Sequence, residues 1–116
     1  MYKQGDIVLV PIPFTDLTSS KKRPVLILSN NNYNNTKEDI IVAAITSNLY
    51  DGNYSIMITN DDMVDGNLLR DSCVRADKLY TLSQSLIIKK FGKLRNETII
   101  TVVNNVFNLI DNKEKT

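Results

Sequence analysis

The sequence contains no histidine and no tryptophan, and it has only one cysteine. Without histidine, the chain cannot form a Ser-His or Cys-His hydrolytic pair. A structural zinc site would also have too few ligands. The single cysteine, Cys73, excludes an intrachain disulfide and favours a reducing, cytoplasmic location. We therefore expect neither a metal nor a cofactor.

Long apolar runs and a strong charge bias are also lacking. No run approaches the roughly 20 residues of a membrane span, and the first residues lack the layout of a signal peptide. The 116 residues, 42% hydrophobic and 23% charged, predict a single soluble domain over 1–116, with a solvated tail at 112–116. Because the net charge is only +1, any contact with nucleic acid must come from local clusters of basic residues.

An acidic run, "DDMVDG", resembles part of a calcium-binding EF-hand loop. Met63 occupies the position of the third ligand, however, and Ser72 stands where the bidentate glutamate belongs. The run is therefore predicted to be a solvated turn. The sequence also has no phosphate-binding P-loop and no GxGxxG motif.

Most of the chain shows the pattern of short β-strands. Runs of β-branched and alternating residues predict strands over 6–12, 24–29, 39–47, 54–60 and 72–82. The polar segments 14–22 and 30–35 are predicted to be loops. Strands at this spacing are typical of a small barrel or a sandwich.

The C-terminal segment changes to a helical pattern. Apolar residues recur at helical spacing, and Asn96 is a plausible N-cap with Glu97 in the first turn. The apolar positions are Ile99, Val102, Val103, Val106, Leu109 and Ile110. The predicted fold is mainly β, a barrel-like domain with one C-terminal helix.

The densest positive charge, Lys21, Lys22 and Arg23, directly precedes a strand that begins with Pro24. A guanidinium can bind two phosphate oxygens at once, and the proline favours an extended conformation at Arg23. A short run of charges is more often only a solvated surface. The residues alone favour that second interpretation.

Five segments in order resemble the MazF/PemK family of toxins from bacterial toxin–antitoxin pairs. They are "GDIVLVPIPFTD", "KKRPVLILS", "IIVAAITS", "SCVRADKLYTL" and "FGKL" followed by the helix, and together they cover about residues 4 to 110. The resemblance implies a small SH3-like barrel of the MazF/PemK/CcdB type that forms a homodimer. It also implies an endoribonuclease that cleaves single-stranded RNA without a metal. The ribose 2′-OH attacks the adjacent phosphate and leaves 2′,3′-cyclic phosphate and 5′-OH ends.

The same resemblance implies roles for individual residues. Arg23 matches the family's catalytic arginine, and Thr46 and Ser47 match its threonine-serine pair. Arg75 and Asp77 match an R-x-D motif of the PemK branch, in which both residues are catalytic. From the residues alone, Thr46 and Ser47 are equally explained as turn formers, and Arg75 with Asp77 as a surface salt bridge. A carboxylate beside an arginine is also a weak base.

Other residues are implied in binding RNA or depart from the family pattern. Lys21 and Lys22 would help to gather the RNA. Thr18 lies near the position at which some PemK proteins have a histidine, and Tyr80 stands where many members have an arginine. The tyrosine can instead stack on a base. A cognate antitoxin is implied as a partner, with a disordered segment that covers the groove.

A second function remains open from the sequence. The chain could be a non-catalytic barrel of the same fold that binds RNA or a protein, as the gyrase poison CcdB does. The C-terminal residues "NLIDNKEKT" lack the tryptophan-containing motif that such poisons use. This absence favours the ribonuclease.

Overall fold

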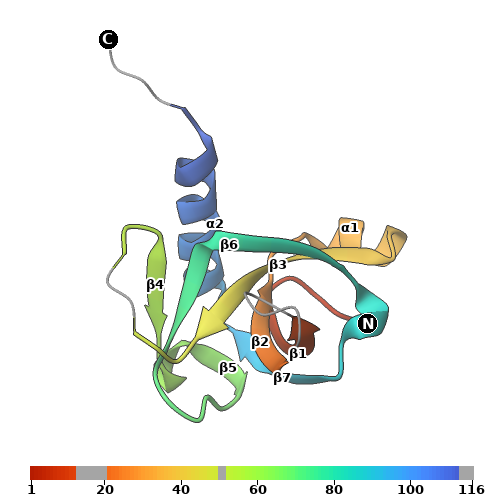
Figure 1. The fold of residues 1–116 in the computed structure, drawn as a ribbon, viewed down its shortest axis with the longest axis horizontal. Helices are drawn as coiled ribbons and strands as arrows, with labels where there is room; N and C mark the ends of the chain where they lie inside the picture. The colour runs from red at the N-terminus through yellow and green to blue at the C-terminus, as the bar shows by residue number, and fades with distance from the viewer. Residues whose placement is uncertain (13–20, 50–51, 113–116) are drawn as a thin grey trace.

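The computed structural model describes residues 1–12, 21–49 and 52–112. One seven-stranded sheet curls into a half-barrel, and a C-terminal helix packs against it (Figure 1). The strands are β1 (Asp6–Ile12), β2 (Lys21–Ile27), β3 (Asp39–Thr46), β4 (Ser55–Ile58), β5 (Met63–Gly66), β6 (Ser72–Ser83) and β7 (Lys89–Leu94). The helices are α1 (Asn31–Thr36) and α2 (Asn96–Ile110). The prediction of a small barrel with a C-terminal helix is confirmed.

The strand order in the sheet is β4-β6-β3-β2-β1-β7-β5, and every pair is antiparallel. Ile7 lies opposite Leu26, and Leu26 lies opposite Ala43. Because residues that face each other across strands point to the same side, this row forms one face of the sheet. The strand register therefore determines which side chains can meet at the site described below.

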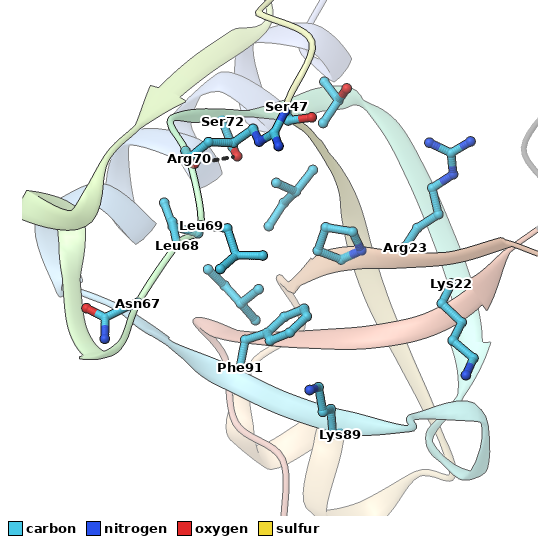
Figure 2. A pocket seen from close by; sticks show the side chains of 14 residues that line it. Lys22, Arg23, Ser47, Asn67, Leu68, Leu69, Arg70, Ser72, Lys89 and Phe91 are labelled. Atoms are coloured by element: carbon cyan, nitrogen blue, oxygen red, sulfur yellow. Dashed lines mark hydrogen bonds between the residues drawn. The ribbon is translucent and has the colours of Figure 1, made fainter.

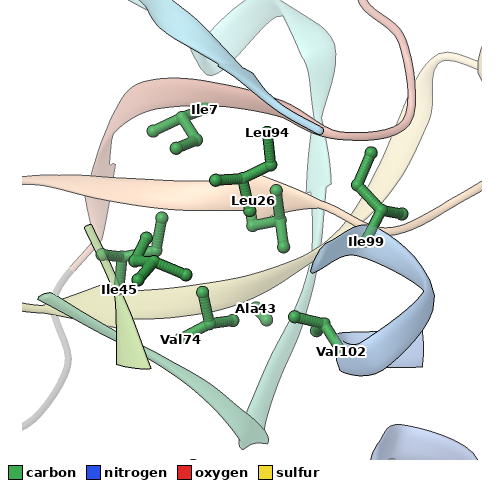
Figure 3. Packing of buried hydrophobic residues seen from close by; sticks show 9 residues of the cluster. Ile7, Leu26, Ala43, Ile45, Val74, Leu94, Ile99 and Val102 are labelled. Atoms are coloured by element: carbon green, nitrogen blue, oxygen red, sulfur yellow. The ribbon is translucent and has the colours of Figure 1, made fainter. Parts of the chain in front are cut away.

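The core has one apolar cluster on each face of the curled sheet. On one face, Ile7 and Leu26 pack with Ile99 and Val102 from α2 (Figure 3). On the other face the cluster consists of the buried residues Val8, Val10, Val25, Ile27, Ile40 and Val42. The second cluster comes entirely from apolar strand runs that the sequence predicts, whereas the first also takes residues from β7 and from α2.

The segment 30–35, predicted to be a loop, contains the short helix α1 instead. The side chain of Asn30 accepts a hydrogen bond of 2.8 Å from the backbone N–H of Tyr33 and caps the helix. Asn34 is buried, and its amide donates to the carbonyl of Ser29 at 2.9 Å. The prediction is wrong because capping and buried side-chain hydrogen bonds, rather than an apolar pattern, stabilise this helix.

The starts of two elements and the structure of the acidic run also differ from the predictions. Strand β2 begins at Lys21 rather than at residue 24, so the basic residues belong to the strand. Helix α2 begins at Asn96 with Arg95 as its N-cap, and the cap makes no side-chain hydrogen bond. The acidic run is not only a turn, because it forms a 3-10 turn at Asn60–Asp62 and then β5, which pairs with β7. A pairing partner so distant in sequence cannot be seen from the local pattern.

Neither of the helices in the described part of the chain is long and apolar enough to cross a membrane.

Candidate functional site

A groove with a volume of about 640 Å³ opens beside the start of β2 and the end of β3. Its floor and walls are mainly apolar, and they comprise Ile7, Pro24, Ile45, Leu68, Leu69 and Phe91. Four cationic side chains line it as well: Lys22, Arg23, Arg70 and Lys89. Figure 2 shows Lys22 and Arg23 on one side of the groove and Arg70 on the opposite side. The groove thus combines an apolar floor with positively charged rims.

No carboxylate lines the groove among the residues that the structure describes. Four of the chain's 14 lysines and arginines therefore gather in one place, although the net charge of the whole chain is only +1. An apolar wall lowers the local dielectric and strengthens the field of such a cluster. The groove is therefore electrostatically suited to an anionic ligand.

Arg23 and Thr46 lie on neighbouring strands, at the same end of the β2–β3 pairing. Val25 lies opposite Ala44, and Arg23 and Thr46 each lie two residues beyond this pair. Both residues line the groove, together with Ser47. The hydroxyl oxygen of Thr46 accepts a hydrogen bond of 3.1 Å from the N–H of Asn48. Its own hydrogen therefore remains available for donation to a ligand oxygen.

Arg70 and Lys89 are cations of the groove that the sequence analysis did not identify. Arg70 lies in the segment between β5 and β6, which two side chains hold in place. The side-chain oxygen of Asn60 accepts from the backbone N–H of Leu68 at 2.7 Å, and its NH₂ group donates to the Leu68 carbonyl at 3.3 Å. The hydroxyl of Ser72 donates to the carbonyl of Arg70 at 3.1 Å. No local pattern could have indicated Arg70, because this segment reaches the groove only when β5 pairs with β7.

Glycines allow that pairing at the groove wall. Gly66 has φ of +76° and lies opposite Gly92, and a Cβ on Gly66 would collide with the carbonyl oxygen of Phe91. A Cβ on Gly92 would likewise collide with the carbonyl oxygen of Asp65. Only glycine permits so close an approach of two backbones at a positive φ. The two glycines therefore fix the position of Phe91 relative to the segment that carries Arg70.

Arg75 and Asp77 do not line the groove. They form a bidentate salt bridge. The Nε of Arg75 donates to Oδ1 of Asp77 at 2.8 Å, and its Nη2 donates to Oδ2 at 2.9 Å. Arg75 lies opposite Ala44, and Cys73 lies opposite Thr46. Because residues two apart in a strand point to the same side, Arg75 and Thr46 share one face of the sheet. The structure thus brings Arg23, Thr46 and Ser47 into one groove and leaves the Arg75–Asp77 pair beside it.

The hydrogen bond from Arg75 holds the pKa of the Asp77 carboxyl below its ordinary value, against the opposing effect of burial. Because this pKa is lower in the folded than in the unfolded chain, the pair stabilises the fold above the unfolded pKa of about 3.9. The stabilisation is lost as the pH falls through the folded value. Asp77 is consequently ionised at neutral pH.

The substitution Asp77→Asn should therefore lower the free energy of unfolding at pH 7 by about 0.2–1 kcal/mol, as for partly exposed ion pairs. The difference from the unmodified chain should shrink as the pH falls from 5 toward 2. Urea denaturation at several pH values measures it, with the exposed Asp39→Asn as the control. A difference that does not shrink as the pH falls below the unfolded pKa of about 3.9 would contradict the assignment of the pKa shift to this pair.

The remaining predicted residues lie elsewhere. Lys21 is exposed and pairs with Ile12 at the start of β2, outside the groove lining. Tyr80 is half-buried, lies opposite Val42 and packs against the apolar cluster of that face, also outside the groove lining. Thr18 lies outside the described residues.

Comparison with known proteins agrees with this architecture. A family model described as the PemK-like, MazF-like toxin of type II toxin–antitoxin systems matches residues 3–110. A search of curated proteins by sequence gave no significant match.

Several solved structures share the fold. An endoribonuclease from a mycobacterial species, in complex with its cognate antitoxin, matches with a TM-score of 0.77, 17% identity and coverage of 93% of each chain. The Mycobacterium tuberculosis toxin MazF-mt6 matches with a TM-score of 0.74 and 22% identity, over 94% of this chain and 99% of that one. A MazE–MazF structure from Deinococcus radiodurans matches with a TM-score of 0.71 and 17% identity, over 94% of both chains.

Proposed function

Because this chain belongs to the PemK-like, MazF-like toxins of type II toxin–antitoxin systems, we propose that it is an endoribonuclease that cleaves single-stranded RNA in the groove. The observation that carries the proposal is the meeting of Arg23 with Thr46 and Ser47 in a groove lined by four cations. RNA supplies the phosphate for the cations and unstacked bases for the apolar floor. The resulting loss of mRNA would inhibit translation and growth.

The proposed reaction is a transesterification within the RNA. The 2′-oxygen attacks the adjacent phosphorus, the bond from phosphorus to the 5′-oxygen breaks, and a 2′,3′-cyclic phosphate forms. Solvent water takes the proton of the 2′-OH and supplies one to the leaving 5′-oxygen, so the second product ends in 5′-OH. Negative charge grows on the phosphate oxygens in the transition state. The permanent charge of Arg23 and the hydroxyl hydrogen of Thr46 are placed to stabilise it.

Arg75 and Asp77 would support the reaction by binding RNA rather than by moving a proton. The lowered pKa makes the Asp77 carboxylate a weak base toward a ribose hydroxyl. Its two bonds to Arg75 instead fix the direction of that guanidinium. Arg75 shares a sheet face with Thr46, so it can bind a phosphate next to the scissile one.

The test is an assay on a long, mixed-sequence single-stranded RNA in the presence of EDTA. We expect discrete cuts, with 5′-OH and 2′,3′-cyclic phosphate ends, because neither the attack nor the charge stabilisation needs a metal. Mapping of the fragment ends would reveal the cut-site motif. Absence of cleavage by the folded protein, purified without any antitoxin, would contradict the proposed function.

We also propose a cognate antitoxin as a partner in the cytoplasm. Solved relatives include an endoribonuclease in complex with its cognate antitoxin and a MazE–MazF structure. An acidic, apolar segment would complement the cationic rims and apolar floor of the groove. It would then compete directly with RNA.

Helix α2 supports a further part of the proposal, a homodimer. Its buried residues, Thr98, Ile99 and Val102, all lie in the first half of the helix. Figure 1 shows the second half extending away from the sheet. An apolar stripe on the helix, made of Ile100, Val103, Phe107 and Ile110, is exposed, and Phe107 is 59% exposed. Exposed apolar stripes of this kind mark protein interfaces, and a second copy of the chain would cover it.

The substitution Phe107→Lys should raise the dimer dissociation constant by roughly a hundredfold, as for central aromatic residues of interfaces. Sedimentation analysis over a range of protein concentrations measures it. Asn108→Lys, at an exposed polar position of the same helix that is not three or four residues from any stripe residue, serves as the matched control for added charge. A monomer at all concentrations in the unmodified protein would exclude the homodimer.

A further inference from the structure

Phe91 occupies an unusual position in β7, at the end of the groove. Ile7 lies opposite Gly92 and Val8 lies opposite Lys90, so Phe91 is the extra residue of a β-bulge. Bulges redirect a side chain and are frequent beside functional sites. Phe91 packs against the core cluster that contains Ile7 and also lines the groove (Figure 2). The strand therefore presents a firmly supported aromatic ring to the groove.

A cation covers the ring. The Nζ atom of Lys89 lies 5.2 Å from the centroid of the Phe91 ring, and Lys89 is exposed to solvent. Such a contact is weak at an exposed site, whereas a nucleic-acid base stacks on an aromatic ring more strongly. A base can therefore displace the ammonium group from the ring. The displaced lysine then carries its charge to a neighbouring phosphate.

The surroundings of the ring indicate what kind of ligand fits there. Across the groove from the ring, Arg70 adds a second cation from the segment that Asn60 and Ser72 hold in place (Figure 2). Leu69, which is 100% exposed, extends the apolar surface at this end. A volume of about 640 Å³ is in the range of small-molecule sites, about 300–1,000 Å³. A planar base joined to an anionic phosphate matches the ring, the cations and the size together.

Resting on the proposed function, we infer that Phe91, Lys89 and Arg70 form a nucleotide subsite beside Arg23. One base of the bound RNA stacks on Phe91 in place of the Lys89 ammonium. Lys89 and Arg70 bind the phosphates on either side of that base. Because stacking needs an unpaired base, the subsite makes the groove selective for single-stranded RNA.

The first test compares Phe91→Leu with the unmodified protein. Leucine keeps an apolar side chain but removes the aromatic face. The probe is a short, mixed-sequence 2′-O-methyl RNA, which lacks the attacking hydroxyl, and fluorescence anisotropy gives its dissociation constant. We expect roughly tenfold weaker binding for Phe91→Leu, as for loss of one stacked base. An abasic oligonucleotide of the same length, the control ligand, should bind both proteins equally.

A second variant keeps the inference testable if Phe91→Leu fails to fold. The sequence has no tryptophan, so Phe91→Trp introduces a single fluorescent reporter at the ring position. Addition of the 2′-O-methyl RNA should quench its emission, and the abasic oligonucleotide should not. Lys89→Ala should also lower the slope of log affinity against log salt by about 0.7, the value of one phosphate contact with a single strand.

The outcomes separate the subsite from the proposed function. If the protein cleaves RNA through Arg23, but Phe91→Leu binds normally and Phe91→Trp shows no quenching, the subsite is wrong and the function stands. If the unmodified protein neither binds nor cleaves single-stranded RNA, both are wrong. If only an acidic, apolar peptide binds, and equally well to Phe91→Leu, the aromatic ring serves no base and the inference is overturned.

Discussion

Replacing Arg23 by alanine is expected to slow RNA cleavage by roughly a thousandfold, the upper range for loss of one preorganised donor to a developing charge. The guanidinium has a permanent charge and two parallel donors, and it lines the same groove as the Thr46 hydroxyl. The melting temperature of Arg23→Ala is measured alongside, so that a slower rate is assigned to the missing guanidinium only in a folded variant. Single-turnover cleavage of RNA with a mapped cut site measures the loss.

Two further variants show what the arginine contributes. Arg23→Lys keeps the charge but not the paired donors, so its activity should lie between that of alanine and that of the unmodified protein. Lys37→Ala removes an exposed cation outside the groove and should leave the rate unchanged. If Arg23→Ala remained fully toxic to cells, the target would be a protein rather than RNA, as for a CcdB-like poison. If it failed to fold, Arg23 would be a structural residue.

Replacing Gly66 by alanine should cause the largest loss of stability, because two effects add. A residue other than glycine at φ of +76° costs about 1–3 kcal/mol, and the new Cβ also collides with the backbone oxygen of Phe91. Backbone cannot move aside as a side-chain end can, so β5 must shift away from β7. Affinity for RNA should fall as well, because Arg70 follows β5 in the chain. Urea denaturation and anisotropy measure the two effects.

The neighbouring substitution Asp65→Ala tests whether the effect belongs to the glycine. Asp65 is exposed and pairs with Lys93 at a position without a positive φ, so alanine there should change stability by less than about 0.5 kcal/mol. Equal losses in both variants would mean that the β5–β7 pairing, rather than the conformation of Gly66, is being measured. Unchanged stability in Gly66→Ala would contradict the collision.

The sequence by itself determined most of the sheet, the C-terminal helix and half of the groove. The apolar runs around Val8, Val25 and Val42 predict their strands because burial of alternating or continuous apolar residues is a local pattern. Arg23, Thr46 and Ser47 could be identified because their segments resemble a family motif. Helix α1 was missed, since Asn30 and Asn34 stabilise it through individual hydrogen bonds that have no periodicity.

The tertiary structure alone decided the other half of the groove. Arg70 and Lys89 come from segments about twenty residues apart and belong to no recognised motif, and the segment "FGKL" that contains Phe91 gave no indication that its ring lines the groove. They meet because β5 pairs with β7 through Gly66 and Gly92, and because a bulge turns Phe91 toward the groove. The structure also left Arg75 and Asp77 beside the groove. Strand pairing between distant segments depends on the packing of the whole sheet, and this is why no local sequence pattern could predict it.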